Sequence, residues 1–179
     1  MRKVGPDISG ITKISICVAL LCVCSYIVIP LPFTPIVFSM HTLVINLIGL
    51  ILRKKDAALT VFIYLLMGFC GLPVFSKGLS GPLILFGPTG GFYFGFLIAA
   101  IVISILRKNK NNIKSFFLIT VFAGIPIQHI FAIIFICFYN GFNVSSAFLT
   151  VSLPFIPTDI IKCFMASFIA VKLNKIFLR

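Results

Sequence analysis

Two ionisable side chains of opposite charge stand three residues apart in the apolar stretch LPFIPTDIIKCFMA (153–166). On a helix, Asp159 and Lys162 share one face and can reach each other or a common ligand. A carboxylate accepts N–H donors, and an ammonium holds a carboxylate or steadies the acid. Because ionisable groups in apolar surroundings are costly unless they face a partner or a cavity, the pair predicts a small-molecule site.

The same pair also has a purely structural interpretation. Pro154 and Pro157 precede it, so we expect the helix to begin near Thr158, whose hydroxyl can cap it. An acid in the first turn is favoured by the helix dipole, and a lysine near a helix end can extend its ammonium to the membrane interface. This alternative is the weaker of the two.

The rest of the chain has the composition of an integral membrane protein. Of its 179 residues, 60% are hydrophobic and 10% are charged, and the mean hydropathy is +1.21. A soluble domain would lack the polar residues to cover so apolar a chain, so a lipid bilayer is the expected surrounding. The net charge of +12 comes from short basic runs between apolar stretches, which indicates anionic lipid headgroups and no nucleic acid.

The apolar pattern predicts an all-α membrane protein with six transmembrane helices in a single domain, residues 1–179. The apolar segments run over 11–29, 37–52, 57–70, 91–106, 115–139 and 155–178. The longest breaker is Gly/Pro-rich and lies between helices 3 and 4, at 71–91. Lipid cannot satisfy irregular backbone, so we expect this loop to fold over or into the bundle.

The distribution of charge predicts the orientation in the plasma membrane. With six spans and the N-terminus in the cytoplasm, all 15 basic residues except Lys77 and Lys162 fall on the cytoplasmic side, as the positive-inside rule requires. Both termini are then cytoplasmic and the Gly/Pro-rich loop is extracellular. Asp7 and Asp56 join the inner group, which leaves Asp159 as the sole acid of the outer half.

Residue patterns argue against an enzyme and against a resident cofactor or metal. Six cysteines lie in or beside apolar runs without a CxxC motif or a His cluster, so they are interpreted as packing residues. An intramembrane hydrolase or lipid transferase would need a base with a nucleophile, a metal set or clustered acids, and the three separated acids provide none. The chain has no GxxxxGK[ST] motif for ATP hydrolysis.

Three stretches resemble motifs of the BioY family, the biotin-binding S components of energy-coupling factor transporters. They are IPLPFTPIVFSMHTL (29–43), GLPVFSKGLSGPLILFGPTGGFYFGF (71–96) and PFIPTDIIKCFMA (154–166). The family motifs read like IPxPFxPVPxTxQTL, GLPVFxGGxxGxxxLxGPTGGYLxGF and PFxPGDxxK, in the same order and with similar spacing. The resemblance implies a six-helix protein that captures biotin externally and docks on a transmembrane coupling protein and two ATPase subunits.

The resemblance also implies which residues contact biotin. The ureido ring would supply donors to Asp159, and the valerate or a hydrogen-bond network would engage Lys162, although the assignment of ligand groups stays open. Phenylalanines beside the loops are expected to form apolar walls, as in most small-molecule sites. The candidate substrate-binding residues are Asp159, Lys162, Ser80, His41, Tyr93, Gly90, Phe75 and Phe92, with Phe33, Phe38, Phe86 and Phe155 as further wall residues.

The chain departs from the family pattern at several positions in these motifs. Lys77 stands where a glycine is usual, and Leu79 stands where a small polar residue is common. His41 replaces the Gln of the QTL motif, and Phe92 replaces the Tyr after GPTGG. These changes affect the detailed hydrogen bonding more than the identity of the ligand. For His41 and His129, packing or hydrogen-bonding roles are the first expectation, with His41 the better candidate for the pocket.

The first predicted helix carries a stripe of small residues. Ser15, Ala19 and Cys22 stand at i, i+4 and i+7, which allows close approach of another helix. The resemblance implies that the stripe docks the coupling protein, and packing within the chain is the alternative. Rival functions are an S component for thiamin or riboflavin, a structural subunit, and, least favoured, an intramembrane enzyme.

Overall fold

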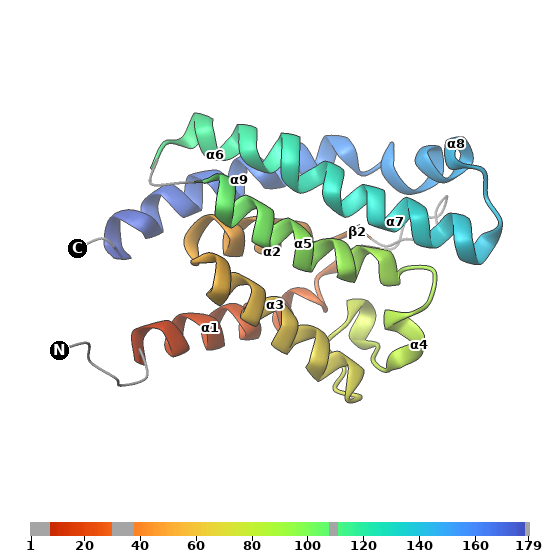
Figure 1. Cartoon of the computed structure of the whole chain (residues 1–179), viewed down its shortest axis with the longest axis horizontal. Helices are drawn as coiled ribbons and strands as arrows, with labels where there is room; N and C mark the ends of the chain where they lie inside the picture. The colour runs from red at the N-terminus through yellow and green to blue at the C-terminus, as the bar shows by residue number, and fades with distance from the viewer. Residues whose placement is uncertain (1–7, 30–37, 108–110, 178–179) are drawn as a thin grey trace.

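The chain folds into a helical bundle whose long helices run roughly along the longest axis of the molecule. The computed structural model describes residues 8–29, 38–107 and 111–177. Figure 1 shows α6 (Ile113–Ile119), α7 (Ile125–Asn140) and α9 (Ile156–Phe177) along one side, α1 (Ile8–Cys24) and α3 (Lys54–Phe69) along the other, and α2 (His41–Ile51) and α5 (Gly90–Leu106) between them. The start of α1 and the end of α9 lie at the same end of the bundle (Figure 1).

A helix occupies most of each of the six predicted apolar segments, although Val28–Ile29 and Phe38–Ser39, at the edges of the first two, are strands. The helices in these segments are α1, α2, α3, α5, the continuous stretch α6–η2–α7, and α9. In chain order the elements are α1 (Ile8–Cys24), β1 (Val28–Ile29), β2 (Phe38–Ser39), α2 (His41–Ile51), α3 (Lys54–Phe69), η1 (Ser76–Gly78), α4 (Pro82–Leu85), α5 (Gly90–Leu106), α6 (Ile113–Ile119), the π-helix η2 (Thr120–Gly124), α7 (Ile125–Asn140), α8 (Val144–Ala147), the π-helix η3 (Phe148–Ser152) and α9 (Ile156–Phe177). The strands β1 and β2 form a short antiparallel pair.

The predicted start of the last helix was wrong by two residues. Helix α9 begins at Ile156, so Thr158 lies inside its first turn. The hydroxyl of Thr158 donates to the carbonyl of Phe155 at 2.7 Å and therefore does not cap the helix. Proline is tolerated at this end because the first turn of a helix needs no donor there, which explains why Pro157 failed to mark the boundary.

Helix α2 lies at the centre of the fold. Its residues from His41 to Leu50 are all buried except Leu43, and it packs against α5 and α9. The main core cluster draws on α1, α2, α3, α5 and α9. A smaller cluster lies between α7 and the helices before α9, with Ala132 and Val151 among its fully buried members.

Two glycines allow α5 and α7 to approach closely. A Cβ at Gly91 would come within 2.2 Å of the carbonyl oxygen of Phe131, and a Cβ at Gly95 would come within 3.0 Å of the Cα of Gln128. Backbone atoms cannot move aside as the end of a side chain can. Glycine at these two positions therefore allows the backbones of α5 and α7 to pack directly against each other.

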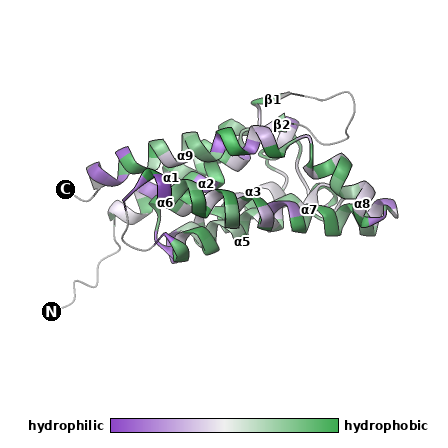
Figure 2. Ribbon diagram, turned by 90° about the horizontal axis from the view of Figure 1, so that it is seen from above, coloured by the Kyte–Doolittle hydropathy of each residue, from purple (hydrophilic) through white to green (hydrophobic). Residues whose placement is uncertain are grey.

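Large apolar side chains cover much of the outer surface. Phe122, Phe138 and Leu83 are 74%, 82% and 87% exposed, and hydrophobic residues follow most of the length of the helices in Figure 2. Exposed apolar surface on this scale requires a partner or lipid. Within the described ranges, the stretch Ile113–Asn140 is long and apolar enough to cross a membrane alone.

A second candidate span is a broken one. The helices Val144–Ser152 and Ile156–Lys175 pass the same test together, although they are bent by 52° at their junction. Helices α1, α2 and α5 are apolar but have only 10–17 residues, short of the roughly 20 needed to cross a hydrocarbon core unaided. Helix lengths therefore do not establish the predicted number of six spans.

The close α5–α7 contact predicts a stability defect for Gly91→Ala. The added methyl must push against the backbone of α7, so we expect the free energy of unfolding to fall by about 1–3 kcal/mol. Thermal unfolding of the purified protein in detergent measures this. Ile105→Ala on the exposed face of the same helix is the control, with an expected change of about 0.5 kcal/mol or less. Equal losses from both variants would contradict this account of the contact.

Candidate functional site

A cavity of about 130 Å³ lies where β2, α2, α5, α7 and α9 meet the Gly/Pro-rich loop. Aromatic side chains form much of the lining, with Phe92, Tyr93 and Phe96 from neighbouring positions of α5 and Phe155 from the segment before α9. The polar groups come from elements far apart in the sequence. The polar residues of its lining are Ser39, Thr42, Ser76, Lys77, Thr89, His129, Asp159 and Lys162.

Asp159 and Lys162 form a buried ion pair in this cavity. They are 3% and 4% exposed, and the Lys162 Nζ lies 2.9 Å from Oδ1 of Asp159. The same ammonium donates to the carbonyl oxygen of Ser39 at 2.8 Å and stands 3.9 Å from the centre of the Phe38 ring. Protein groups therefore occupy the donor directions of Lys162.

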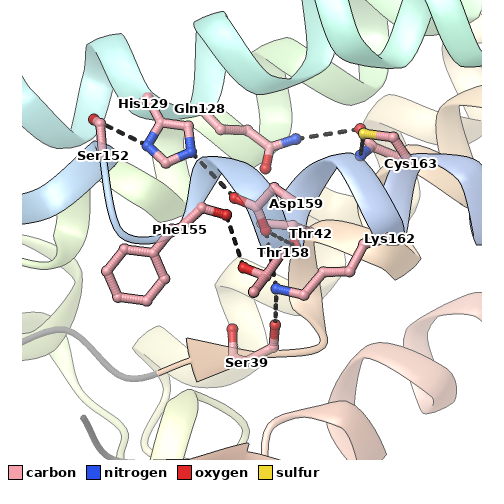
Figure 3. A network of polar contacts seen from close by, with 11 residues as sticks. Ser39, Thr42, Gln128, His129, Ser152, Phe155, Thr158, Asp159, Lys162 and Cys163 are labelled. Atoms are coloured by element: carbon pink, nitrogen blue, oxygen red, sulfur yellow. Dashed lines mark hydrogen bonds and ion pairs between the residues drawn. The ribbon is translucent and has the colours of Figure 1, made fainter.

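Helices α2 and α7 complete the environment of Asp159 (Figure 3). The Thr42 hydroxyl donates to Oδ1 at 3.0 Å, and Nε2 of His129 lies 3.1 Å from Oδ2. In the neutral imidazole, donation from Nε2 leaves Nδ1 as the acceptor for the Ser152 hydroxyl, 3.1 Å away. Each carboxylate oxygen accepts about two hydrogen bonds, so Oδ2 keeps acceptor capacity for a ligand.

The comparisons with known proteins agree on one family. The model of the BioY family matches residues 1–179. The chain belongs to the BioY family. It is 35% identical to "Biotin transporter BioY" of Thermotoga maritima, over 92% of this chain and 95% of the relative. It is 31% identical to "Biotin transporter BioY2" of Lactococcus lactis subsp. cremoris, over 88% of this chain and 86% of the relative.

A solved structure has the same fold. It is the crystal structure of the S-component for biotin from an ECF-type ABC transporter, with a TM-score of 0.91 and 22% sequence identity, and the match covers 98% of this chain and 95% of that chain. Membership of a family of transporters, together with the apolar surface, makes this chain a membrane protein. The BioY family is a family of transporters rather than of enzymes.

The structure places half of the sequence-predicted contacts in the cavity. Asp159, Lys162, Tyr93 and Phe92 line it. Tyr93 also accepts a hydrogen bond from the backbone N–H of Ser76 at 3.2 Å, so it holds the loop as well as the wall. These four residues are brought together from α5 and α9, two helices that the sequence alone does not relate.

Four other predicted contacts lie outside the lining. His41 is fully buried, and its Nε2 lies 2.8 Å from the hydroxyl of Tyr64. The Phe75 ring fills the space above Gly68, where a Cβ would lie 2.1 Å from it. Gly90 allows α5 to start close to the Leu85 carbonyl, 1.9 Å from an ideal Cβ. Ser80 lies in the loop beside Leu79, and it is Leu79 that lines the cavity.

The expected apolar walls divide in the same way. Phe155 lines the cavity, and Phe38 contributes its ring to the Lys162 ammonium. Phe86 is half exposed and packs against Phe94, outside the lining. Phe33 lies outside the described residues.

Sequence reasoning missed Thr42 and ranked His129 too low. Thr42 follows His41, and successive residues of a helix point about 100° apart. The choice of His41 instead of Thr42 therefore selected a face of α2 that does not line the cavity. His129 stands with Gln128 as a polar pair within an apolar segment, which was the available signal. Thr42 and His129 both line the cavity, whereas His41 does not.

The structure also corrects the statement that no base stands beside a nucleophile. Ser152, His129 and Asp159 form a hydroxyl–imidazole–carboxylate series. The Ser152 side chain is fully buried and does not belong to the cavity lining. The series orients the acid. The described residues contain no group of three or more His, Cys, Asp or Glu that could hold a metal ion.

The buried pair predicts strong coupling between Asp159→Ala and Lys162→Met. Each single variant leaves one buried charge without its partner, so we expect each to lower the free energy of unfolding by about 3–5 kcal/mol. The double variant removes both charges and should cost much less than the sum. Thermal unfolding in detergent measures all four proteins.

The exposed pair Arg53–Asp56 provides the matched control cycle. Its charged atoms lie 2.8 Å apart, close to the 2.9 Å of the buried pair, but the Arg53 side chain is 70% exposed. Arg53→Met and Asp56→Ala should couple by about 1 kcal/mol or less. Additive losses at Asp159 and Lys162 would show that the two charges do not depend on each other.

Proposed function

We propose that the chain is the biotin-binding S component of an energy-coupling factor importer. The observation that carries this proposal is Asp159, which lines a partly aromatic cavity and whose Oδ2 accepts from His129 alone among the described residues, in a chain of the BioY family. A biotin-binding S component needs such an acceptor for an N–H group of the ureido ring. Both named relatives are biotin transporters.

The cavity matches the chemistry of biotin at its buried end. A bicyclic ring system packs well between flat aromatic side chains, and here Phe92, Phe96 and Phe155 provide them. One ureido N–H would then meet Oδ2 of Asp159, because its Oδ1 already accepts from Thr42 and Lys162. Thiamin carries a permanent positive charge, and the one acid of the lining, Asp159, is already paired with Lys162.

The proposed membrane topology has six spans and cytoplasmic termini. The Gly/Pro-rich loop would then lie on the external side and cover the cavity. Helix α2 is too short to cross the bilayer alone, but it is buried within the bundle on nearly all sides. Its length therefore need not match the lipid thickness, because protein rather than lipid surrounds it.

The proposed partners are a transmembrane coupling protein and two ATPase subunits. The chain lacks a phosphate-binding GxxxxGK[ST] motif, so energy for release would come from the ATPases. Ser15 and Ala19 of α1 are exposed and Cys22 is partly buried. A row of small exposed side chains leaves room for a helix of the coupling protein. No enzymatic activity is proposed.

Calorimetry with the purified protein tests the ligand. We expect biotin to bind and thiamin and riboflavin not to bind. Asp159→Asn should weaken biotin binding by about 1.5 kcal/mol or more, roughly tenfold or more, because a charged acceptor is lost. Asp56→Asn is the matched control and should leave the affinity unchanged. Wild-type affinity in a folded Asp159→Asn variant would overturn the site, and preferential binding of another vitamin would overturn the ligand.

The stripe on α1 predicts a selective loss of partner binding. Ala19→Leu places a large side chain where a helix must approach, so co-purification with the coupling protein should fall while biotin affinity stays the same. Ser145→Leu, an exposed small-to-large change near the other end of the bundle, should preserve both properties. If Ala19→Leu associates as the wild type does, the stripe is not the docking surface.

A further inference from the structure

Lys77 adopts a backbone conformation that disfavours its own side chain. Its φ and ψ are 66° and 21°, and among the described residues it is the one non-glycine with positive φ. The Cβ of an L-residue is crowded in this left-handed region, so glycine is the residue that fits best. The loop has glycine at three other positive-φ positions, Gly71, Gly78 and Gly81.

The loop itself imposes this conformation. The Lys77 N–H donates to the carbonyl of Ser25 at 3.1 Å, and the Gly78 N–H donates to the carbonyl of Phe75 at 2.9 Å. On the other side, the Ser76 N–H donates to the Tyr93 hydroxyl. The backbone of Lys77 is thus held by Ser25, the residue after α1, and its neighbours Ser76 and Gly78 are held by α5 and by the loop itself. Nothing in these contacts requires a lysine side chain.

The Lys77 side chain brings a second positive charge to the cavity. Lys77 and Lys162 both line it, but they differ in burial and in partners. Lys162 is buried and bonded to Asp159 and Ser39. Lys77 is exposed, and the ion pairs found among the described residues join Arg53 to Asp56 and Asp159 to His129 and Lys162. The Lys77 ammonium therefore remains available to an anion.

The two ends of the cavity differ as the two ends of biotin do. At the buried end, Asp159 and Lys162 neutralise each other and Asp159 offers an acceptor, which suits a neutral N–H donor. At the exposed end, Lys77 offers a cation, which suits a carboxylate. A ligand with a neutral ring at one end and a carboxylate on a flexible chain at the other matches both ends at once.

We infer that Lys77 is a specificity-determining residue that binds the ligand carboxylate at the mouth of the cavity. This inference rests on the proposed function. It assigns the carboxylate of the ligand to Lys77 rather than to Lys162. It also explains why a lysine occupies a position where the backbone favours glycine. Strain of this kind is expected where a side chain has a function.

The test compares biotin with biotinamide, in which a neutral amide replaces the carboxylate. Calorimetry with the wild type should give a preference for biotin of about threefold to tenfold, because an exposed charge pair contributes modestly. Lys77→Gly should bind both compounds equally, at the wild-type affinity for biotinamide. Raising the salt concentration should reduce the preference of the wild type.

The backbone makes Lys77→Gly an informative variant. Glycine relieves the left-handed strain, so thermal unfolding should show equal or higher stability, and weaker binding then reflects the lost ammonium. Lys77→Asn is a second neutral variant that tolerates this conformation. Lys77→Arg should keep the preference for biotin. Lys114→Gln, an exposed change at the start of α6, controls for overall charge and should also keep it.

The outcomes separate this inference from the proposed function. If the wild type binds both compounds equally, or if Lys77→Gly or Lys77→Asn keeps the wild-type preference, the role of Lys77 is overturned and biotin binding stands. If the wild type binds neither compound, the proposed function fails and the inference fails with it. Loss of the preference in both neutral variants and its retention in Lys77→Arg supports the assignment.

Discussion

The buried ion pair between Asp159 and Lys162 is the interaction on which the rest of the site depends. Two charges removed from water are tolerated only when they pair with each other and when hydrogen bonds satisfy their remaining lone pairs and protons. Here those bonds come from Thr42 on α2, His129 on α7 and Ser39 at the end of β2. The pair therefore requires three separate elements to converge on the first turns of α9, and this convergence forms the cavity wall.

The same requirement sets the register of the two central helices. Thr42 bonds to Asp159, and Asn46 bonds to Cys163 at 3.3 Å. Both bonds join residues 117 positions apart, so α2 and α9 run in the same direction and advance by one turn together. Gln128 extends the seam to α7 by donating to Asn46. A sliding of α2 along α9 would break both bonds at once.

The sequence predicted the helices much better than it predicted the cavity. Long apolar segments between charged or Gly/Pro breakers give helix positions directly, and all six are helical. The sequence did not predict α8 and η3 (residues 144–152), because this segment is short and polar residues interrupt it. The six-span topology stays a prediction, since length and apolarity single out Ile113–Asn140 and one bent pair.

The sequence predicted those site residues whose chemistry is unusual for an apolar segment. It did not predict those whose place in the site depends on which face of a helix points toward the cavity. An acid and a lysine in an apolar segment have few structural explanations, which is why Asp159 and Lys162 stood out. His41 and Thr42 are equally polar neighbours, and only the packing of α2 decides which of them faces α9. His129 needed knowledge that residues 23 and 30 positions later, Ser152 and Asp159, fold back against it.

Protein groups satisfy the charges and hydrogen bonds of Asp159 and Lys162 without a ligand. This affects how a carrier can release its ligand. If a ligand had to neutralise a buried charge, its departure would leave that charge unpaired at a cost of several kcal/mol. In this protein the lysine, the threonine and the histidine satisfy the acid, and a ligand N–H would add one further bond to Oδ2. Binding can then gain from that bond and from the aromatic walls, while release leaves the protein with a stable polar network.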